Sequence, residues 1–220
     1  MGACLTQNTA WTNVEKALGN LRRERLLTIS GIRRTPQPEL ERLIRPAGYF
    51  RQKALRLKTF VRFLDERFGG SLRRMFAVPT AELRNEFLAL NGVGPETADS
   101  ILLYAGNHPV FVVDAYTRRI LERHGIVSNA TDYEDIRLLF ESALAGMDSL
   151  EQSLDEAPSA TDPAGSCHAP SRASTADRTA LVQIFNEMHA LIVGVGKTYC
   201  LKSQPRCEQC PLQKFLCQAK

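Results

Sequence analysis

The chain has 220 residues, of which 44% are hydrophobic, 24% charged and 7% aromatic, and its formal net charge is +4. Such a composition is typical of a globular protein with one or two domains and a substantial core. No apolar run is long enough to cross a membrane, and no signal peptide is recognisable. We therefore expect a cytoplasmic protein that makes no membrane contact.

The charge is distributed unevenly along the chain. Residues 1–74 contain 16 Lys and Arg against 6 Asp and Glu, whereas residues 75–220 contain 12 against 18. A basic half favours contact with the phosphates of a nucleic acid, whose neutralisation releases counterions. A solvated helical surface can have the same composition, so the charge alone leaves both interpretations open.

The first part of the chain predicts a succession of helices. Apolar residues at spacings of three and four, from Trp11 to Leu21, indicate a helix over Cys4–Leu21. A long helix is predicted over Tyr49–Phe68, and one of its faces is basic, with Arg51, Lys53, Arg56, Lys58 and Arg62. The shorter helices expected here are Glu24–Ile29, Glu39–Ile44, Ser71–Met75 and Ala81–Leu90, the last with Thr80 as its N-cap.

A glycine turn followed by an aspartate marks the middle of the chain. Gly92 and Gly94 form a Gly-x-Gly turn, and Pro95 begins the next helix, where the missing N–H of proline does no harm. An apolar run after this helix leads to Asp114, which precedes a basic amphipathic helix over Ala115–Arg123. Glycines allow a tight turn between helices, and the unpartnered N–H groups at a helix start favour an anion such as a phosphate.

Two further helices are predicted after this region, over Tyr133–Ala145 and Ala180–Val195. Between them, residues 148–179 are rich in Ser, Ala, Asp, Pro and Thr and almost lack large apolar residues. Such a segment cannot bury enough surface to order itself, so we expect a disordered insertion. Cys167 and His168 lie inside it, and we assign them no metal role.

Four of the six cysteines fall in the last 21 residues, in the pattern C-x6-C-x2-C-x6-C. Without a secretion signal, this pattern favours a metal centre over a disulfide framework. Four cysteine thiolates suit either a [4Fe–4S] cluster or a tetrahedral zinc ion, and their spacing alone does not separate the two.

Several stretches together resemble the endonuclease III superfamily of helix-hairpin-helix DNA glycosylases. They are LTQNTAWTNVEKAL, AGYFRQKALRLKTF, LNGVGPETADSILLYA with VDAYTRRIL behind it, and KTYCLKSQPRCEQCPL. The resemblance implies an all-α fold of two domains, a helical bundle with the hairpin over residues 4–110 and a cluster domain over 111–220. Family members carry a further helix upstream, so we expect that an N-terminal helix is missing from this sequence.

The resemblance implies that Asp114 is the catalytic carboxylate. Cutting an N-glycosidic bond builds positive charge on the sugar, which a nearby carboxylate stabilises while it positions or activates the attacking water. The structural alternative is that Asp114 only caps the helix after it, and the two roles are compatible. The residues expected to contact DNA are Gln7, Tyr49, Lys53, Gly92, Val93, Gly94 and Thr97, although Gln7 and Tyr49 can equally be ordinary surface or packing residues.

Glu96 is where this chain departs from one branch of the family. Bifunctional members, which also nick the strand, have at this position a lysine that forms a Schiff base with the sugar. No lysine occurs anywhere in Leu90–Arg123, so the sequence resembles a monofunctional glycosylase, and the glutamate resembles that of the 3-methyladenine DNA glycosylases. If Glu96 points into the pocket, its charge raises the pKa of Asp114; alternatively it only favours the positive end of its own helix.

The cysteine loop resembles the cluster loop of endonuclease III, with a last gap one residue longer. The resemblance implies a [4Fe–4S] cluster held by Cys200, Cys207, Cys210 and Cys217, with zinc as the alternative. We expect a monomer on the DNA of the nucleoid that removes a damaged or mispaired base from duplex DNA. The competing hypotheses are a bifunctional glycosylase and AP lyase, and a non-catalytic, structure-specific DNA-binding protein.

Overall fold

The structure is a computed structural model, and it describes residues 1–145 and 178–216. Over these residues the regular structure is helical and contains no strand, which confirms the all-α expectation. The chain divides into two compact units, Met1–Ile101 and Leu102–Lys220. The division falls inside one helix and earlier than the boundary expected after residue 110.

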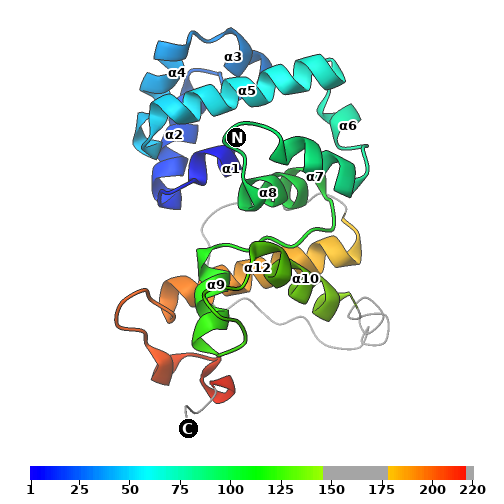
Figure 1. Ribbon diagram of the computed structural model, residues 1–220. Coiled ribbons are helices and arrows are strands. Elements are labelled where there is room, and N and C mark those ends of the chain that lie inside the picture. The colour runs from blue at the N-terminus through cyan, green and yellow to red at the C-terminus, as the bar shows by residue number, and fades with distance from the viewer. Residues whose placement is uncertain (146–177, 217–220) are drawn as a thin grey trace, which may run out of the picture. The chain divides into compact units, whose positions relative to one another are not determined.

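The first unit is built around one long helix, α5 (Phe50–Phe68), which packs against α3 (Ile29–Arg34) and α4 (Gln37–Ile44) (Figure 1). Its Leu57, Val61 and Leu64 are buried and form an apolar stripe along the helix. Burial of such a stripe is the main source of stability for a surface helix. The other helices of this unit are α1 (Gly2–Thr6), α2 (Trp11–Arg23), α3 (Ile29–Arg34), α4 (Gln37–Ile44), η1 (Arg45–Ala47), α6 (Leu72–Met75), α7 (Thr80–Leu88) and the start of α8 (Pro95–Gly106).

Two of the helices expected in this unit are wrong: one is divided in two, and the other does not form. The continuous helix predicted over Cys4–Leu21 is divided into α1 and α2, because Asn8 adopts a left-handed φ of 51° between them. The helix predicted over Glu24–Ile29 does not form. Instead α3 begins at Ile29, where the Thr28 side chain accepts a hydrogen bond from the N–H of Gly31 and acts as the N-cap.

The second unit contains the end of α8 and three further helices, α9 (Ala115–Arg123), α10 (Tyr133–Leu144) and α12 (Ala180–Thr198), with short turns η2 (Cys207–Gln209) and η3 (Gln213–Phe215). The predicted apolar run before Asp114 lies in its core. There Phe111 stacks on Phe140, with ring centroids 4.1 Å apart, and meets Phe185 edge-on at 5.8 Å. Because this run packs with α10 and α12, the division between units comes earlier than expected.

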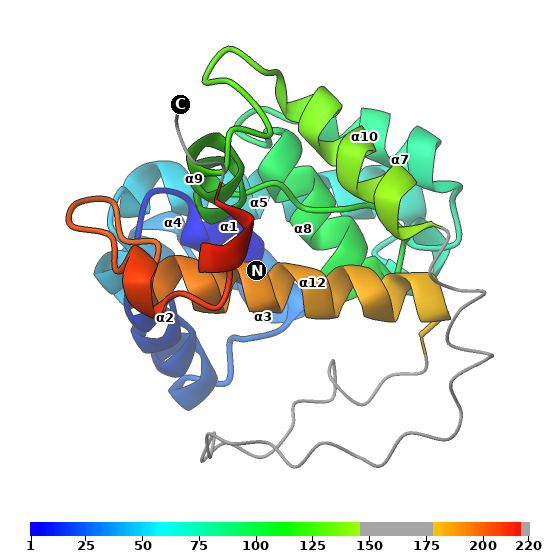
Figure 2. The same cartoon turned by 90° about the horizontal axis from the view of Figure 1, so that it is seen from below.

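The packing of α9 on α12 determines where Asp114 lies in this unit. Figures 1 and 2 show α9 lying across the C-terminal half of α12. Gly196 allows this approach, because a Cβ built there would lie only 2.7 Å from Cγ of Tyr116 on α9. Arg119 of α9 then donates hydrogen bonds to the carbonyl oxygens of Cys200, at 2.7 Å, and Gly196, at 3.1 Å.

No helix in the described ranges is long and apolar enough to cross a membrane. The insertion predicted as disordered, with Cys167 and His168, lies almost entirely outside the described residues, and so does Cys217.

Candidate active site

The predicted hairpin joins α7 to α8 through a turn that ends at Gly94. Gly92 has a φ of +84°, a backbone conformation that favours glycine, and a Cβ there would lie 2.9 Å from Cδ and Cγ of Arg56, so the arginine side chain would have to move. A Cβ on Gly94 would meet nothing within 4 Å. The exposed backbone at Gly94, just before the N-terminus of α8, is therefore open to a ligand such as a phosphate.

Gln7 lies against this turn. Its Nε2 donates to the carbonyl oxygen of Gly92, at 3.0 Å, and to Oγ1 of Thr97, at 2.8 Å. Its Oε1 accepts a hydrogen bond from the Arg56 guanidinium. The structure thus brings together Gln7, Gly92 and Thr97, which were predicted as DNA contacts, and it adds Arg56, which the sequence placed only on a basic face.

Lys53 does not lie on the surface as predicted. Only 1% of it is exposed, and its Nζ donates to the backbone carbonyl oxygens of Leu5, at 3.0 Å, and Ala47, at 2.7 Å. Burial lowers the pKa of this amine, and the nearby Arg56 charge lowers it further. The ammonium joins α5 to the segments at Leu5 and Ala47, and this structural role takes the place of the predicted DNA contact.

The remaining predicted residues of the first unit differ in exposure. Tyr49 is 66% exposed and has a left-handed φ of 43° at the start of α5. Glu96 is exposed in the first turn of α8. Val93 is 8% exposed, so it contributes to the turn through its backbone and its packing.

Asp114 is the N-cap of α9, as predicted. Its Oδ1 accepts hydrogen bonds from the N–H of Thr117, at 2.8 Å, and from the Thr117 hydroxyl, at 3.0 Å. Its second oxygen, Oδ2, lies 3.6 Å from Nε2 of His189 on α12, and only 13% of the Asp114 side chain is exposed. The cap fixes one oxygen of the carboxylate and leaves the other for chemistry.

The environment of Asp114 favours its charged form. Burial acts to raise its pKa, but the interactions with His189 and with Thr117 lower the pKa by more, so it lies below the ordinary aspartate value. The carboxylate is therefore ionised at neutral pH, as stabilisation of a cationic sugar requires.

Two residues that the sequence analysis missed lie next to Asp114. The Tyr104 hydroxyl contacts Nδ1 of His189, and the two rings meet edge-on with centroids 5.8 Å apart. Their positions are 85 residues apart, on α8 and α12, and neither falls in a short motif. A histidine and a tyrosine at that separation carry no local signal that could have identified them.

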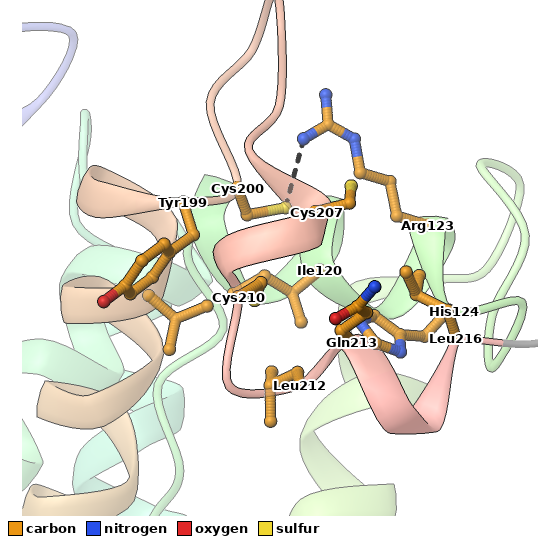
Figure 3. A pocket seen from close by; sticks show the side chains of 11 residues that line it. Ile120, Arg123, His124, Tyr199, Cys200, Cys207, Cys210, Leu212, Gln213 and Leu216 are labelled. Atoms are coloured by element: carbon orange, nitrogen blue, oxygen red, sulfur yellow. Dashed lines mark hydrogen bonds between the residues drawn. The ribbon is translucent and has the colours of Figure 1, made fainter.

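Cysteines line a pocket at the C-terminal end of the second unit (Figure 3). Cys200, Cys207 and Cys210 share it with apolar residues, and all three are free of disulfides. Arg123 donates a hydrogen bond of 3.1 Å to Sγ of Cys200, drawn as a dashed line in Figure 3. Among the described residues no three His, Cys, Asp or Glu side chains are close enough to hold a metal ion, and the fourth cysteine of the motif is not among them.

This pocket nevertheless suits a thiolate-bound group. Its soft sulfur donors suit such a group, and the apolar wall formed by residues such as Ile120, Leu212 and Leu216 and the guanidinium that donates to sulfur are compatible with it. Three of the four predicted cysteines thus line one pocket, and their role as metal ligands stays a prediction.

Comparison with known families and proteins agrees with this geometry. The family described as "HhH-GPD superfamily base excision DNA repair protein" matches residues 1–145. The "Putative DNA repair glycosylase MJ1434" of Methanocaldococcus jannaschii is 38% identical over 216 residues, which are 98% of this chain and 82% of that protein. The mouse "Endonuclease III-like protein 1" is 28% identical over 199 residues, and the match spans 90% of this chain but only 51% of the mouse protein.

A structural relative has the same fold. The Helicobacter pylori 3-methyladenine DNA glycosylase MagIII, whose structure was determined bound to 1,N6-ethenoadenine, matches with a TM-score of 0.72 and 28% sequence identity. The match covers 89% of this chain and 82% of MagIII. The chain therefore belongs to the HhH-GPD superfamily of base excision DNA repair proteins and is an endonuclease III-like DNA glycosylase.

Proposed function

We propose that this chain is a monofunctional DNA glycosylase that hydrolyses the N-glycosidic bond of a damaged or mispaired base in duplex DNA. The observation that carries the proposal is the Asp114 carboxylate, 13% exposed and fixed at the start of α9 by Thr117. The glutamate at position 96, where bifunctional relatives have a lysine, supports water as the nucleophile.

In the proposed reaction the bond between the sugar and the base breaks, and the base leaves with the bonding electron pair. Positive charge develops on the sugar, and the Asp114 carboxylate stabilises it. A water molecule then forms a bond to the sugar carbon and gives a proton to Asp114. The target nucleotide must first leave the base stack to reach the carboxylate.

The proposed DNA contacts are mainly to the backbone. The N–H groups around Gly94 and Thr97, at the start of α8, suit a phosphate, and Gly92 and Val93 shape the turn that presents them. Tyr49 is exposed enough to touch DNA. Gln7, which lies against this turn, is the remaining proposed contact, whereas the buried Lys53 is no longer among them. Phosphate contacts of this kind bind any duplex, so the base specificity must come from the pocket that receives the base. The match to MagIII favours alkylated purines as the substrate class.

The test is an excision assay on a panel of duplexes. Each duplex carries one alkylated, oxidised, deaminated or mismatched base, and the free base released by the purified chain is measured. We expect release from at least one damaged duplex and none from undamaged DNA. Tight binding to the panel without any release would instead favour a non-catalytic DNA-binding protein.

A monofunctional enzyme forms no covalent bond to DNA. We expect borohydride to trap no adduct between this chain and the duplex that it excises best, because an imine requires an amine and position 96 is a carboxylate. The matched variant is Glu96→Lys, which restores the lysine of bifunctional relatives and is expected to become trappable. An adduct with the parent chain would establish a lyase that uses another amine.

Glu96 is proposed to tune Asp114 rather than to react. If its charge acts on Asp114, the carboxylate of Glu96 holds the Asp114 pKa higher than it would otherwise be. Glu96→Gln should then move the acid limb of the rate profile to lower pH, because Asp114 would stay ionised further into the acid range. The measurement is the single-turnover excision rate against pH, and an unchanged acid limb would leave Glu96 only its favourable place at the helix N-terminus.

Cys200, Cys207, Cys210 and Cys217 are proposed to hold a [4Fe–4S] cluster. When bound, such a cluster would supply structure to the loop and no step of the hydrolysis. We expect the purified chain to absorb visible light and to contain iron and acid-labile sulfide. Cys207→Ser should lower the iron content, whereas Cys167→Ser, outside the motif, should not. A colourless protein that contains zinc would establish the alternative metal.

A further inference from the structure

Three side chains of the second unit form a line that ends at the proposed catalytic carboxylate. Tyr104 on α8 contacts Nδ1 of His189 on α12, and Nε2 of His189 lies 3.6 Å from Oδ2 of Asp114. His189 is 9% exposed, and its Nε2 is buried without a hydrogen-bond partner within the usual distance. The charge of Asp114 is the feature toward which this nitrogen points.

The ring of His189 is held firmly in this orientation. Its edge-on contact with Tyr104 has centroids 5.8 Å apart, and a second contact with Phe111 has centroids 6.3 Å apart at an interplanar angle of 77°. Aromatic contacts of this geometry favour one orientation of a buried ring. The imidazole therefore cannot turn away from Asp114 without losing contacts on two sides.

The tautomer of His189 follows from the groups at its two ring nitrogens, Tyr104 at Nδ1 and Asp114 at Nε2. Burial, followed by the negative charge of Asp114, raises the pKa of Tyr104 to about 12, with Arg178 acting in the opposite direction. Tyr104 is thus a protonated hydroxyl at neutral pH and can donate to Nδ1. The hydroxyl can also accept, so the other ring nitrogen decides the tautomer. A neutral imidazole has a single N–H, and because Nε2 faces the Asp114 carboxylate, the proton lies on Nε2 and Nδ1 accepts from Tyr104. The other tautomer would place a nitrogen lone pair against a carboxylate oxygen.

The two oxygens of Asp114 then have different partners. Oδ1 accepts both hydrogen bonds from Thr117. Oδ2 lies opposite Nε2 of His189. The separation of 3.6 Å is longer than a hydrogen bond, but hydrogen bonds in catalytic sites often tighten only when substrate is bound. A neutral donor at this place orients the carboxylate without cancelling its charge.

We propose that Tyr104 and His189 are positioning residues for Asp114. Tyr104 holds the imidazole in the tautomer with its proton on Nε2, and His189 directs that proton at Oδ2. This inference rests on the proposed function, because positioning matters only if Asp114 acts on the sugar. The tautomer itself is a property of the free protein and can be tested without DNA.

The first test is the ¹⁵N NMR spectrum of histidine-labelled protein, with His189 assigned from the loss of its signals in His189→Phe. We expect the shift pattern of a neutral ring protonated at Nε2 in the parent, and loss of this preference in Tyr104→Phe. Tyr199→Phe is the matched control, since it removes a hydroxyl at the C-terminal end of α12, beside the cysteine pocket, and should leave the pattern unchanged. A ring protonated at Nδ1 in the parent overturns the proposal while leaving the proposed function intact.

The second test is the single-turnover excision rate on the best duplex of the panel. His189→Phe keeps an aromatic ring but loses the donor, and we expect a rate about 10-fold to 100-fold lower, as for the loss of a hydrogen bond to a charged group. The affinity for DNA should change little. His189→Gln, whose amide can donate in the same direction, should recover part of the rate. Excision by His189→Phe at the parent rate overturns the proposal.

The pH profile separates positioning from a general loss of structure. Since His189 acts to lower the pKa of Asp114, its replacement by Phe should raise that pKa and move the acid limb to higher pH. Besides His189, the titratable group that interacts with the charge of Asp114 is Tyr104 on α8, and Arg178, just before α12, acts on Tyr104 in turn. Neither changes in this variant. A fall in rate at every pH, with the acid limb unmoved, would contradict the positioning role.

Discussion

Replacing Asp114 by asparagine should lower the single-turnover excision rate by at least about 10²-fold. The loss combines the charge that stabilises the cationic sugar with the base that takes the proton of water, and either contribution alone reaches this size. Asparagine keeps an oxygen that can accept the hydrogen bond from the N–H of Thr117, and it is as good an N-cap as aspartate. The measurement is release of the free base under enzyme excess.

This substitution also separates the two roles of Asp114. If it were only a cap, Asp114→Asn would excise at the parent rate and unfold at the parent temperature. Asp132→Asn is the control for loss of charge, because Asp132 is at the N-cap position of α10 in the same unit and makes no side-chain cap hydrogen bond. We expect that control to keep both rate and stability. Full activity in Asp114→Asn would remove the central claim about the mechanism.

Gly196→Ala should destabilise the fold by about 1–3 kcal/mol, the range for overpacking a well-packed contact. The new Cβ would lie 2.7 Å from Cγ and 2.8 Å from Cβ of Tyr116, atoms close to the backbone of α9 that cannot swing aside. To relieve the clash α9 must move, and Asp114 is its N-cap. We therefore expect a lower midpoint in denaturant unfolding together with slower excision.

Gly194 provides the control on the same helix. A Cβ there meets nothing within 4 Å, and the residue is exposed. Alanine is a better helix former than glycine by about 0.5–1 kcal/mol, so Gly194→Ala should be neutral or stabilising. Two identical substitutions two residues apart are thus expected to have opposite signs. Equal effects would mean that the contact with Tyr116 does not limit the approach of α9 to α12.

Several features of the site could be predicted because they depend on neighbours in sequence. The helix predicted over Ala115–Arg123 has the observed bounds, and Asp114 caps it. The glycine turn before α8 is confirmed, with the positive φ at Gly92 that it required. Caps, turns and helical periodicity are local, so a short window of residues specifies them.

Other predictions were wrong where a distant contact decided the outcome. The pattern of α5 placed Lys53 on a basic face, but the backbone carbonyl oxygens of Leu5 and Ala47 surround its amine. The helical pattern reports which side of a helix a residue occupies. It does not report whether another segment of the chain covers that side, and the N-terminal segment covers it here.

The sequence by itself determined the family pattern, the hairpin, the aspartate at a helix start and the spacing of the cysteines, because each is a short-range arrangement. Only the tertiary structure decided that Gln7 and Arg56 support the turn and that three cysteines share one pocket. It alone brought Tyr104 and His189 to Asp114. These contacts join helices that are far apart along the chain, and they form only when the apolar faces of those helices pack together.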